Sequence, residues 1–128
     1  MSGIQPQLWV DHPIDAIAFY RAAFGATVVH QVGEGDDIVA QLALDDAYFW
    51  VANTDHGMGR FSAAAIGGGT SRTLLVTGDP DTVISAALAA GAIVTSAAGN
   101  EHGWRLGRII DPFGQHWEIG TPTGPWPP

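Results

Sequence analysis

The chain has 128 residues, of which 46% are hydrophobic, and this combination predicts one compact domain with a substantial core. Thirteen acidic residues stand against five arginines and no lysine, so the formal net charge is −8 and no basic stripe is present to bind nucleic-acid phosphates. Cysteine is absent, no apolar run approaches the roughly 18 residues of a membrane span, and the N-terminus resembles no export signal. We therefore expect a cytoplasmic protein that has neither nucleic-acid nor membrane partners.

The first half of the chain predicts a strand, a helix and three further strands. Pro13 suits the first turn of a helix, where its missing N–H leaves no hydrogen bond unmade, and Gly25 suits the position after the last turn. The apolar residues between them recur at helical spacing, so we expect a helix over residues 13–24. Strand-like runs flank this helix, and the last two form a hairpin across Asp45 and Asp46. The expected strands cover residues 4–10, 26–32, 38–44 and 47–52.

The second half repeats the same order of elements. Asp79 is a favourable cap for a helix, Pro80 fits its first position, and Gly91 follows its end. The Gly- and Ala-rich residues 53–71 join the two halves as a linker, and the Pro-rich residues 121–128 predict no regular structure. The expected strands cover residues 72–77, 92–95, 104–110 and 115–120.

The two halves match at a constant offset of 66 residues, which indicates one small βαβββ unit used twice. We predict an α+β fold in which two tandem βαβββ modules form one curved mixed sheet with a concave cup, while the helices lie on its convex side. The matched pairs are Val10 and Val76, Asp15 and Asp81, Gly25 and Gly91, and Asp45 and Asp111. The single domain, residues 1–128, then consists of module 1 at about 4–52, the linker 53–71, module 2 at about 72–120 and the tail 121–128.

Two segments carry a resemblance to a known superfamily. The segment WVDHPIDAIAFYRAAFGA, followed by RLGRIIDPFGQHWEI in the second half, resembles the vicinal oxygen chelate superfamily. This superfamily includes glyoxalase I, extradiol dioxygenases and bleomycin-resistance proteins, and the likeness is greatest to its small glyoxalase-like branch. The resemblance implies paired βαβββ modules, a homodimer and a site on the concave sheet face. It does not by itself imply an enzyme, because function belongs to the site and not to the fold.

The resemblance also implies where a metal would bind. Metal-using relatives carry ligands, mostly His and Glu, near the start of the first strand and on the last strand of each module. The corresponding residues here are Gln5 in module 1, and Glu118 with either Ser71 or Arg72 in module 2. The turn of module 1 at Asp45 and Asp46 is two residues shorter than its counterpart, so the partner of Glu118 is Trp50, whereas without that gap it would be Ala52, which cannot bind a metal. A divalent metal needs three or four N or O donors that converge, and this set offers one good ligand and one tolerable one. We therefore expect no metal and no cofactor.

Strand alternation predicts what the cup contains instead of a metal. If Gln5 and Glu118 face inward, every second neighbour does so too, which gives a cup with aromatic walls and a few polar groups. The expected ligand-binding residues are Gln5, Gln7, Trp9, Tyr48, Trp50, Arg105, His116 and Glu118. The alternate residues, which are Leu8, Val10, Phe49, Val51, Trp117 and Ile119, then pack under the helices. Four alternatives stay open: Trp9 or Trp50 belongs to the core, a hydrogen bond holds Glu118, His116 is a solvated strand residue, and Arg105 pairs with a carboxylate.

Two functional classes follow from these residues. The first is a non-catalytic protein of bleomycin-resistance type that binds and sequesters an aromatic antibiotic or metabolite. The second is a glyoxalase-like lyase or isomerase of the same superfamily that uses Glu118 as its base. The missing His ligands and the aromatic cup favour the first class, so we assign no catalytic residue. We also expect a homodimer, and Trp126 in the tail either packs on the domain or contributes to the dimer contact.

Overall fold

The computed structural model describes residues 1–127 and contains the two predicted βαβββ modules in tandem. Pro128, the last residue of the predicted tail, lies outside the described residues. The first module consists of β1 (Gln7–Val10), α1 (Pro13–Phe24), β2 (Thr27–Val32), β3 (Val39–Leu44) and β4 (Ala47–Asn53), with a 3-10 turn at Gly35–Asp37. The linker contains a 3-10 turn at His56–Met58 and the short helix α2 (Ala63–Ile66). The second module consists of β5 (Arg72–Val76), α3 (Pro80–Ala89), β6 (Ile93–Glu101), β7 (Trp104–Ile110) and β8 (His116–Pro122). No helix within residues 1–127 is long and apolar enough to cross a membrane.

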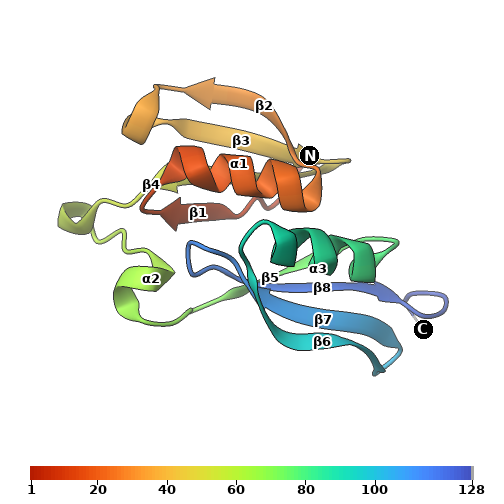
Figure 1. Ribbon diagram of the computed structural model, residues 1–128. Helices are drawn as coiled ribbons and strands as arrows, with labels where there is room; N and C mark the ends of the chain where they lie inside the picture. Colours follow the sequence, from red (N-terminus) through yellow and green to blue (C-terminus); the bar gives the residue numbers. More distant parts are fainter. Residues whose placement is uncertain (128) are drawn as a thin grey trace.

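Each module forms its own four-stranded sheet. The strand orders are β1-β4-β3-β2 and β5-β8-β7-β6, and in each sheet the first pair is parallel while the other pairs are antiparallel. Helices α1 and α3 lie on the same side of the two sheets, as expected (Figure 1). The predicted mixed sheet is built from two separate sheets, because no strand pairing joins them anywhere in residues 1–127.

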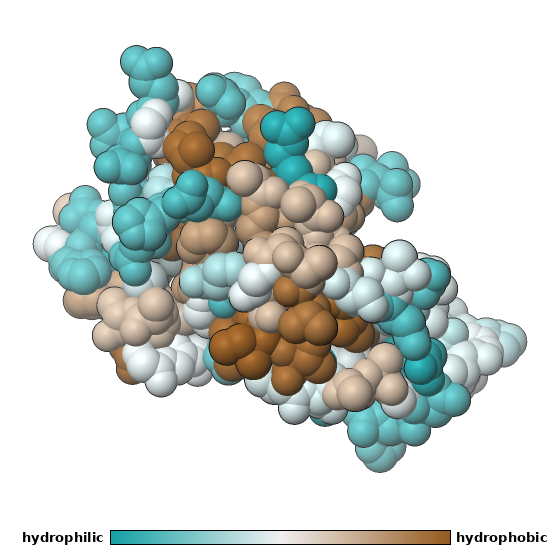
Figure 2. Space-filling view, in the orientation of Figure 1, coloured by the Kyte–Doolittle hydropathy of each residue, from teal (hydrophilic) through white to brown (hydrophobic). Residues whose placement is uncertain are grey.

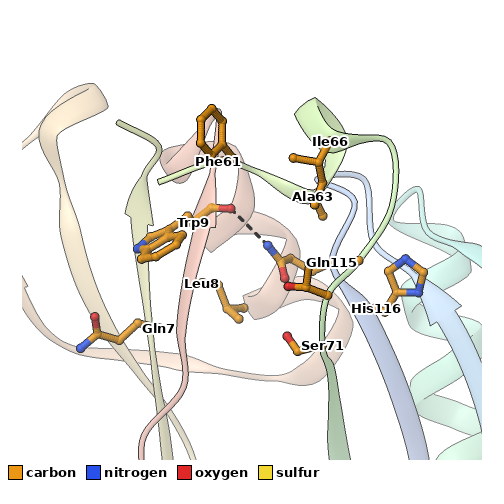
Figure 3. A pocket seen from close by; sticks show the side chains of 11 residues that line it. Gln7, Leu8, Trp9, Phe61, Ala63, Ile66, Ser71, Gln115 and His116 are labelled. Atoms are coloured by element: carbon orange, nitrogen blue, oxygen red, sulfur yellow. Dashed lines mark hydrogen bonds between the residues drawn. The ribbon is translucent and has the colours of Figure 1, made fainter. Parts of the chain in front are cut away.

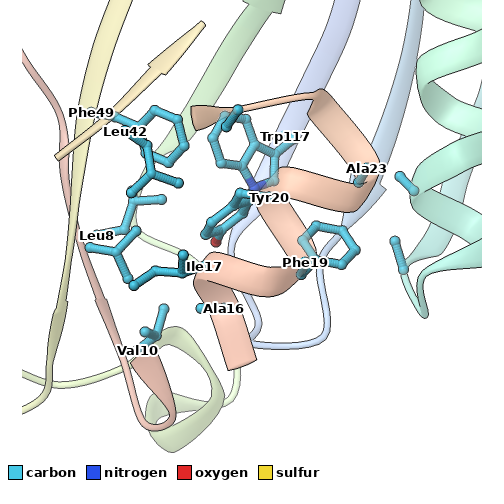
Figure 4. Close-up of a cluster of buried hydrophobic side chains, with 14 of the residues drawn as sticks. Leu8, Val10, Ala16, Ile17, Phe19, Tyr20, Ala23, Leu42, Phe49 and Trp117 are labelled. Carbon is cyan, nitrogen blue, oxygen red and sulfur yellow. The ribbon is translucent and has the colours of Figure 1, made fainter. Parts of the chain in front are cut away.

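A shared core joins the modules in place of strand pairing. Trp117 of β8 packs against Tyr20 of α1 and Phe49 of β4, with ring centroids 5.6 and 5.9 Å apart (Figure 4). Its ring centroid also lies 4.8 Å from that of Phe24 of α1. Burying one large side chain stabilises the fold by about 1.5–3 kcal/mol, so this cluster makes a substantial contribution to module association. All six residues predicted to pack under the helices are buried, which confirms the alternation of β1, β4 and β8.

Local signals in the sequence account for the ends of both long helices. Pro13 begins α1, and Gly25 ends it with a φ of 72°, a left-handed conformation that glycine adopts without strain. The Gly25 N–H donates to the Arg21 carbonyl over 3.1 Å. At α3, a carboxylate oxygen of Asp79 accepts the Thr82 N–H over 3.2 Å, as expected for an N-cap.

Two strands run further than the sequence predicts. β6 continues to Glu101 through two register shifts, because its small residues pair with β7 despite lacking a strand-like pattern. β8 extends into the Pro-rich tail as far as Pro122, which pairs with Trp104. Pairing with β5 ends at Gly120, so Pro122 lies where β8 has one neighbour and a missing N–H is tolerated.

Candidate ligand-binding site

A polar and aromatic cluster lies on the first sheet, on the face away from the helices. Gln5 Oε1 accepts hydrogen bonds from Trp50 Nε1 over 2.8 Å and from Gln41 Nε2 over 3.0 Å. The His30 ring stands nearly perpendicular to the Trp50 indole, with centroids 6.1 Å apart. We call these four residues (Gln5, His30, Gln41 and Trp50) the Trp50 cluster.

Sequence reasoning missed two members of the Trp50 cluster. Strand register aligns Trp50 with Gln41, and Gln41 with His30, so the three side chains form a row across β4, β3 and β2. Alternation applied to β3 would have found Gln41. A register shift between Val28 and His30 interrupts the alternation of β2, and no sequence signal marks it.

The equivalent place in the second sheet holds a charged cluster. Glu118 Oε2 accepts a hydrogen bond from Arg108 Nε over 2.9 Å and lies 3.2 Å from Arg72 Nη2. Arg108 also donates to Glu101 over 2.9 Å, and we call these four residues the arginine cluster. The hydrogen bonds to Glu118 and then to Glu101 raise the pKa of the Arg108 guanidinium. The Glu118 side chain is 14% exposed and is held by two cations.

The two clusters occupy equivalent positions of the repeated module. Trp50 pairs with Gln7 in the first sheet, and Glu118 pairs with Leu74 in the second. Gln5 precedes Gln7 by two residues, as Arg72 precedes Leu74. The module equivalent of Gln5 is therefore Arg72, the second of the two alternatives that the sequence left open.

The residues at these four positions do not fit a metal ion. Both N–H donors of the Trp50 cluster converge on the Gln5 oxygen, and two guanidinium groups hold the Glu118 carboxylate. The indole of Trp50 and the guanidinium of Arg72 have no lone pair to give. Among residues 1–127, no three His, Asp or Glu side chains gather elsewhere in a way that could hold a metal.

The other predicted site residues are divided between the two ends of the seam between the modules. Gln7, Trp9 and His116 line a pocket of about 180 Å³ at one end, where the Gln115 amide donates to the Trp9 carbonyl over 3.1 Å. Tyr48 is 40% exposed and lines a larger cavity of about 830 Å³ at the other end. Gln5 of the Trp50 cluster lines the same larger cavity as Tyr48.

Arg105 lies on the helix side of its sheet, away from the other predicted site residues. Its Nε and Nη2 each donate to the Asp81 carboxylate of α3 over 2.7 Å. This hydrogen-bonded pair lowers the pKa of Asp81 and raises that of Arg105. Arg105 precedes Arg108 by three positions, and an odd spacing on a strand places two side chains on opposite faces. Arg105 therefore pairs with a carboxylate, which is one of the alternatives that the sequence left open.

Asp111 is a buried carboxylate, which the sequence indicated only as part of a turn. It is 4% exposed and accepts hydrogen bonds from the Tyr20 hydroxyl over 2.5 Å and from Trp117 Nε1 over 2.9 Å. The backbone N–H groups of Phe113 and Gln115 donate to its other oxygen over 2.9 and 3.0 Å. Burial raises the pKa of Asp111, and burial together with the Asp111 charge raises the pKa of Tyr20 well above its ordinary value. This carboxylate joins the modules and faces neither pocket.

Two mycobacterial proteins are similar in sequence to this chain over nearly its whole length. No family model matches the sequence. The uncharacterized protein Rv0887c of Mycobacterium tuberculosis is 34% identical over 126 residues, which cover 94% of this chain and 74% of that protein. The uncharacterized protein Mb0911c of Mycobacterium bovis is also 34% identical over 126 residues, which cover 94% of this chain and 83% of that protein.

Solved structures share the fold across nearly the whole chain. The Arabidopsis thaliana gene product At5g48480 superposes with a TM-score of 0.71 at 26% identity, covering 93% of this chain and 98% of that one. A glyoxalase-related enzyme from Fulvimarina pelagi gives a TM-score of 0.71 at 17% identity, with 94% and 88% covered. The fosfomycin resistance protein FosX of Listeria monocytogenes gives 0.73 at 15% identity, with 98% and 93% covered. The chain therefore belongs to one family with these mycobacterial proteins, and it shares its fold with the glyoxalase-related enzyme and with FosX.

Proposed function

We propose that the protein binds and sequesters a planar aromatic small molecule, an antibiotic or a metabolite, without transforming it. The observation that carries this proposal is the Trp50 cluster, in which the two module 1 positions that carry metal ligands in relatives hold the Trp50 indole and the Gln5 amide. Gln5 fixes the edge of the Trp50 indole, which leaves the faces of the ring for stacking. Sparse polar groups around an aromatic surface orient a ligand and give specificity.

The cluster is ordered before any ligand arrives. One oxygen of Gln5 holds both Trp50 and Gln41, and the His30 ring packs against the indole. A binding surface whose side chains are already held loses less conformational entropy on binding. Trp9 is 37% exposed on the same sheet and extends the aromatic area at the border with the smaller pocket.

The arginine cluster weighs against the alternative, an enzyme that uses Glu118 as its base. A general base needs a lone pair within hydrogen-bond reach of the proton that it takes. Arg108 and Arg72 both contact Glu118 Oε2, so a substrate that does not displace them could use only the other carboxylate oxygen. The same two cations offset the attraction that Glu118 would have for a cationic ligand, which favours a neutral one.

The proposal is tested by titrating the protein with a panel of neutral planar aromatic antibiotics and metabolites while tryptophan fluorescence is recorded. We expect quenching by at least one compound, and Trp50→Ala should weaken its binding by about tenfold or more. Trp126→Ala is the matched control, because it also removes one indole and its side chain is 55% exposed and packs on Trp104. Equal affinity in both variants would contradict the proposal, as would turnover of an α-carbonyl substrate that Glu118→Gln abolishes.

A further inference from the structure

The pocket of about 180 Å³ lies at the seam between the modules, under the linker (Figure 3). Trp9 of β1 forms one wall, and Gln115 and His116 at the start of β8 form another. Phe61 and Ile66, which belong to the linker, cover the pocket from above in Figure 3. Three separate segments of the chain therefore build one concavity.

Close contacts hold the linker over this pocket. The Ser62 hydroxyl is fully buried and donates to the Asp11 carboxylate over 2.8 Å. A Cβ at Gly114 would lie 2.7 Å from a backbone nitrogen of α2, so only glycine lets the helix come this close. A Cβ at Gly69 would likewise lie 2.7 Å from the His116 ring. The pocket is consequently preformed and does not depend on closure of a loop.

The pocket lining combines apolar walls with neutral hydrogen-bonding groups. Trp9 and Phe61, which are 37% and 47% exposed, offer ring surface, and Ile66 adds an aliphatic contact. The Gln115 Nε2 group donates to the Trp9 carbonyl, which leaves the amide oxygen to accept a hydrogen bond. The Ser71 hydroxyl lies in the same lining, and no Asp, Glu or Arg does. A charged ligand would lose hydration here, and His116 is the only side chain of this lining that could pair with it.

The size of the pocket suits a ligand with a single ring. An apolar cavity of about 150 Å³ accommodates benzene. A volume of about 180 Å³ adds room for one or two polar substituents on such a ring. We propose that this pocket is a second binding site that takes a neutral monocyclic phenol, whose ring lies by Trp9 and Phe61 and whose hydroxyl donates to the Gln115 amide oxygen. Trp9 borders both sites, but Trp50 belongs only to the first and Gln115 only to the second, so each site can fail without the other.

The experiment titrates the 15N-labelled full chain with phenol and follows the indole N–H signals by NMR. We expect the Trp9 signal to move and to saturate with a Kd of about 1 mM, a reasonable affinity for so small a ligand, while the Trp50 signal stays in place. Benzoate, which is anionic at neutral pH, should bind at least tenfold more weakly. Ile66→Trp should fill the pocket and weaken phenol binding at least tenfold. Ile14→Trp is its matched control, since Ile14 of α1 and Ile66 are 48% and 52% exposed.

Several results would overturn the second site. These are equal binding of phenol by the Ile66→Trp and Ile14→Trp variants, equal binding of benzoate and phenol, or movement of the Trp50 signal in place of the Trp9 signal. Absence of any shift with phenol would overturn the second site as well. It would not affect the test of the proposed function, which uses Trp50→Ala and larger planar compounds. If Ile66→Trp does not fold, Ser71→Leu fills the same pocket from an exposed position and serves in its place.

Discussion

At the scale of single residues, Asp111 connects the two modules through hydrogen bonds inside the core. Its carboxylate accepts from Tyr20 of the first module, from Trp117 of the second and from two backbone N–H groups of its own turn. A buried carboxylate without a cationic partner is expensive, and four donors offset much of that cost. Both oxygens are needed, because each one accepts two of the four bonds.

Asp111→Asn should therefore destabilise the protein strongly. The amide keeps one acceptor oxygen and turns an NH₂ group toward donors, so at least one buried donor loses its partner. We expect a loss of about 2–4 kcal/mol in the free energy of unfolding, measured by urea denaturation. Asp45→Asn is the control, since Asp45 has the matching place in the sequence repeat but is exposed. A loss of similar size in both variants would show that the buried carboxylate has no special role.

Tyr20→Phe should make stability depend more steeply on pH. The Tyr20 hydroxyl donates to Asp111 and lowers a carboxyl pKa that burial raises, so its removal raises this pKa further. A raised carboxyl pKa means that the folded state binds the proton more readily than the unfolded state. The stability that this group contributes is then complete below its ordinary pKa and is lost as pH rises through the raised value.

The measurement for Tyr20→Phe is urea denaturation at two pH values. We expect a loss of about 1–2 kcal/mol at pH 7 and a smaller loss near the ordinary carboxyl pKa of about 3.9, where the neutral acid predominates. The wild-type chain provides the reference at each pH. The same loss at both pH values would contradict the coupling between Tyr20 and the ionised carboxylate.

At the scale of elements, the last strand of each module, β4 or β8, places core residues on one face and site residues on the other. β8 directs Trp117 and Ile119 into the core, where they are 2% and 0% exposed, and directs Glu118 to the opposite face. β4 does the same with Phe49 and Trp50. One strand thus stabilises the fold and presents the candidate site, because neighbouring side chains point to opposite faces.

Substitution of the two tryptophans by alanine should separate these roles. Trp117→Ala removes a ring from the shared core and should cost about 3–5 kcal/mol in the free energy of unfolding. Trp50→Ala removes a half-buried ring and one hydrogen bond, and should cost about 1.5 kcal/mol or less. Urea denaturation followed by circular dichroism measures both values. Should Trp50→Ala destabilise the protein as much as Trp117→Ala, Trp50 belongs to the core and the open sheet face is no binding surface.

At the scale of the whole molecule, exposed apolar surface is the feature that a homodimer would cover. Figure 2 shows an apolar patch on the helix side, over α3 and the neighbouring strands of the second sheet. Leu88 of α3 and Ile93 of β6 are 56% and 65% exposed in this part of the molecule. On β5, Leu74 and Val76 are 44% and 60% exposed and line the larger cavity at the seam. Contiguous apolar surface of this kind is typical of interaction sites.

Sedimentation at micromolar concentration should therefore show a species of twice the chain mass of 13.4 kDa. Ile93→Glu and Leu74→Glu place a charge on one apolar surface each, so the variant that sediments as a monomer identifies the interface. Trp126 packs on Trp104, with ring centroids 5.2 Å apart, and its substitution tests whether the tail contributes as well. A single 13.4 kDa species for the wild-type chain would contradict the dimer.

The sequence by itself determined the modules, the helix ends and the division of each strand into two faces. These features depend on signals within a few residues, such as the proline that begins α1, the glycine that ends it and the alternation of β4. The equivalence of Trp50 and Glu118 required, besides the repeat, a two-residue gap in the turn before β4, and the strand register agrees with it.

Only the tertiary structure decided which side chains meet across distant parts of the chain. The ion pair between Arg72 and Glu118 joins residues 46 positions apart in the sequence. The hydrogen bond from Tyr20 to Asp111 joins residues 91 positions apart. The division of the expected cup into two clusters and a pocket under the linker also arose at this level. Periodicity predicts the face on which a side chain lies, but its partner depends on how the two modules pack through their shared core, and no local pattern encodes that packing.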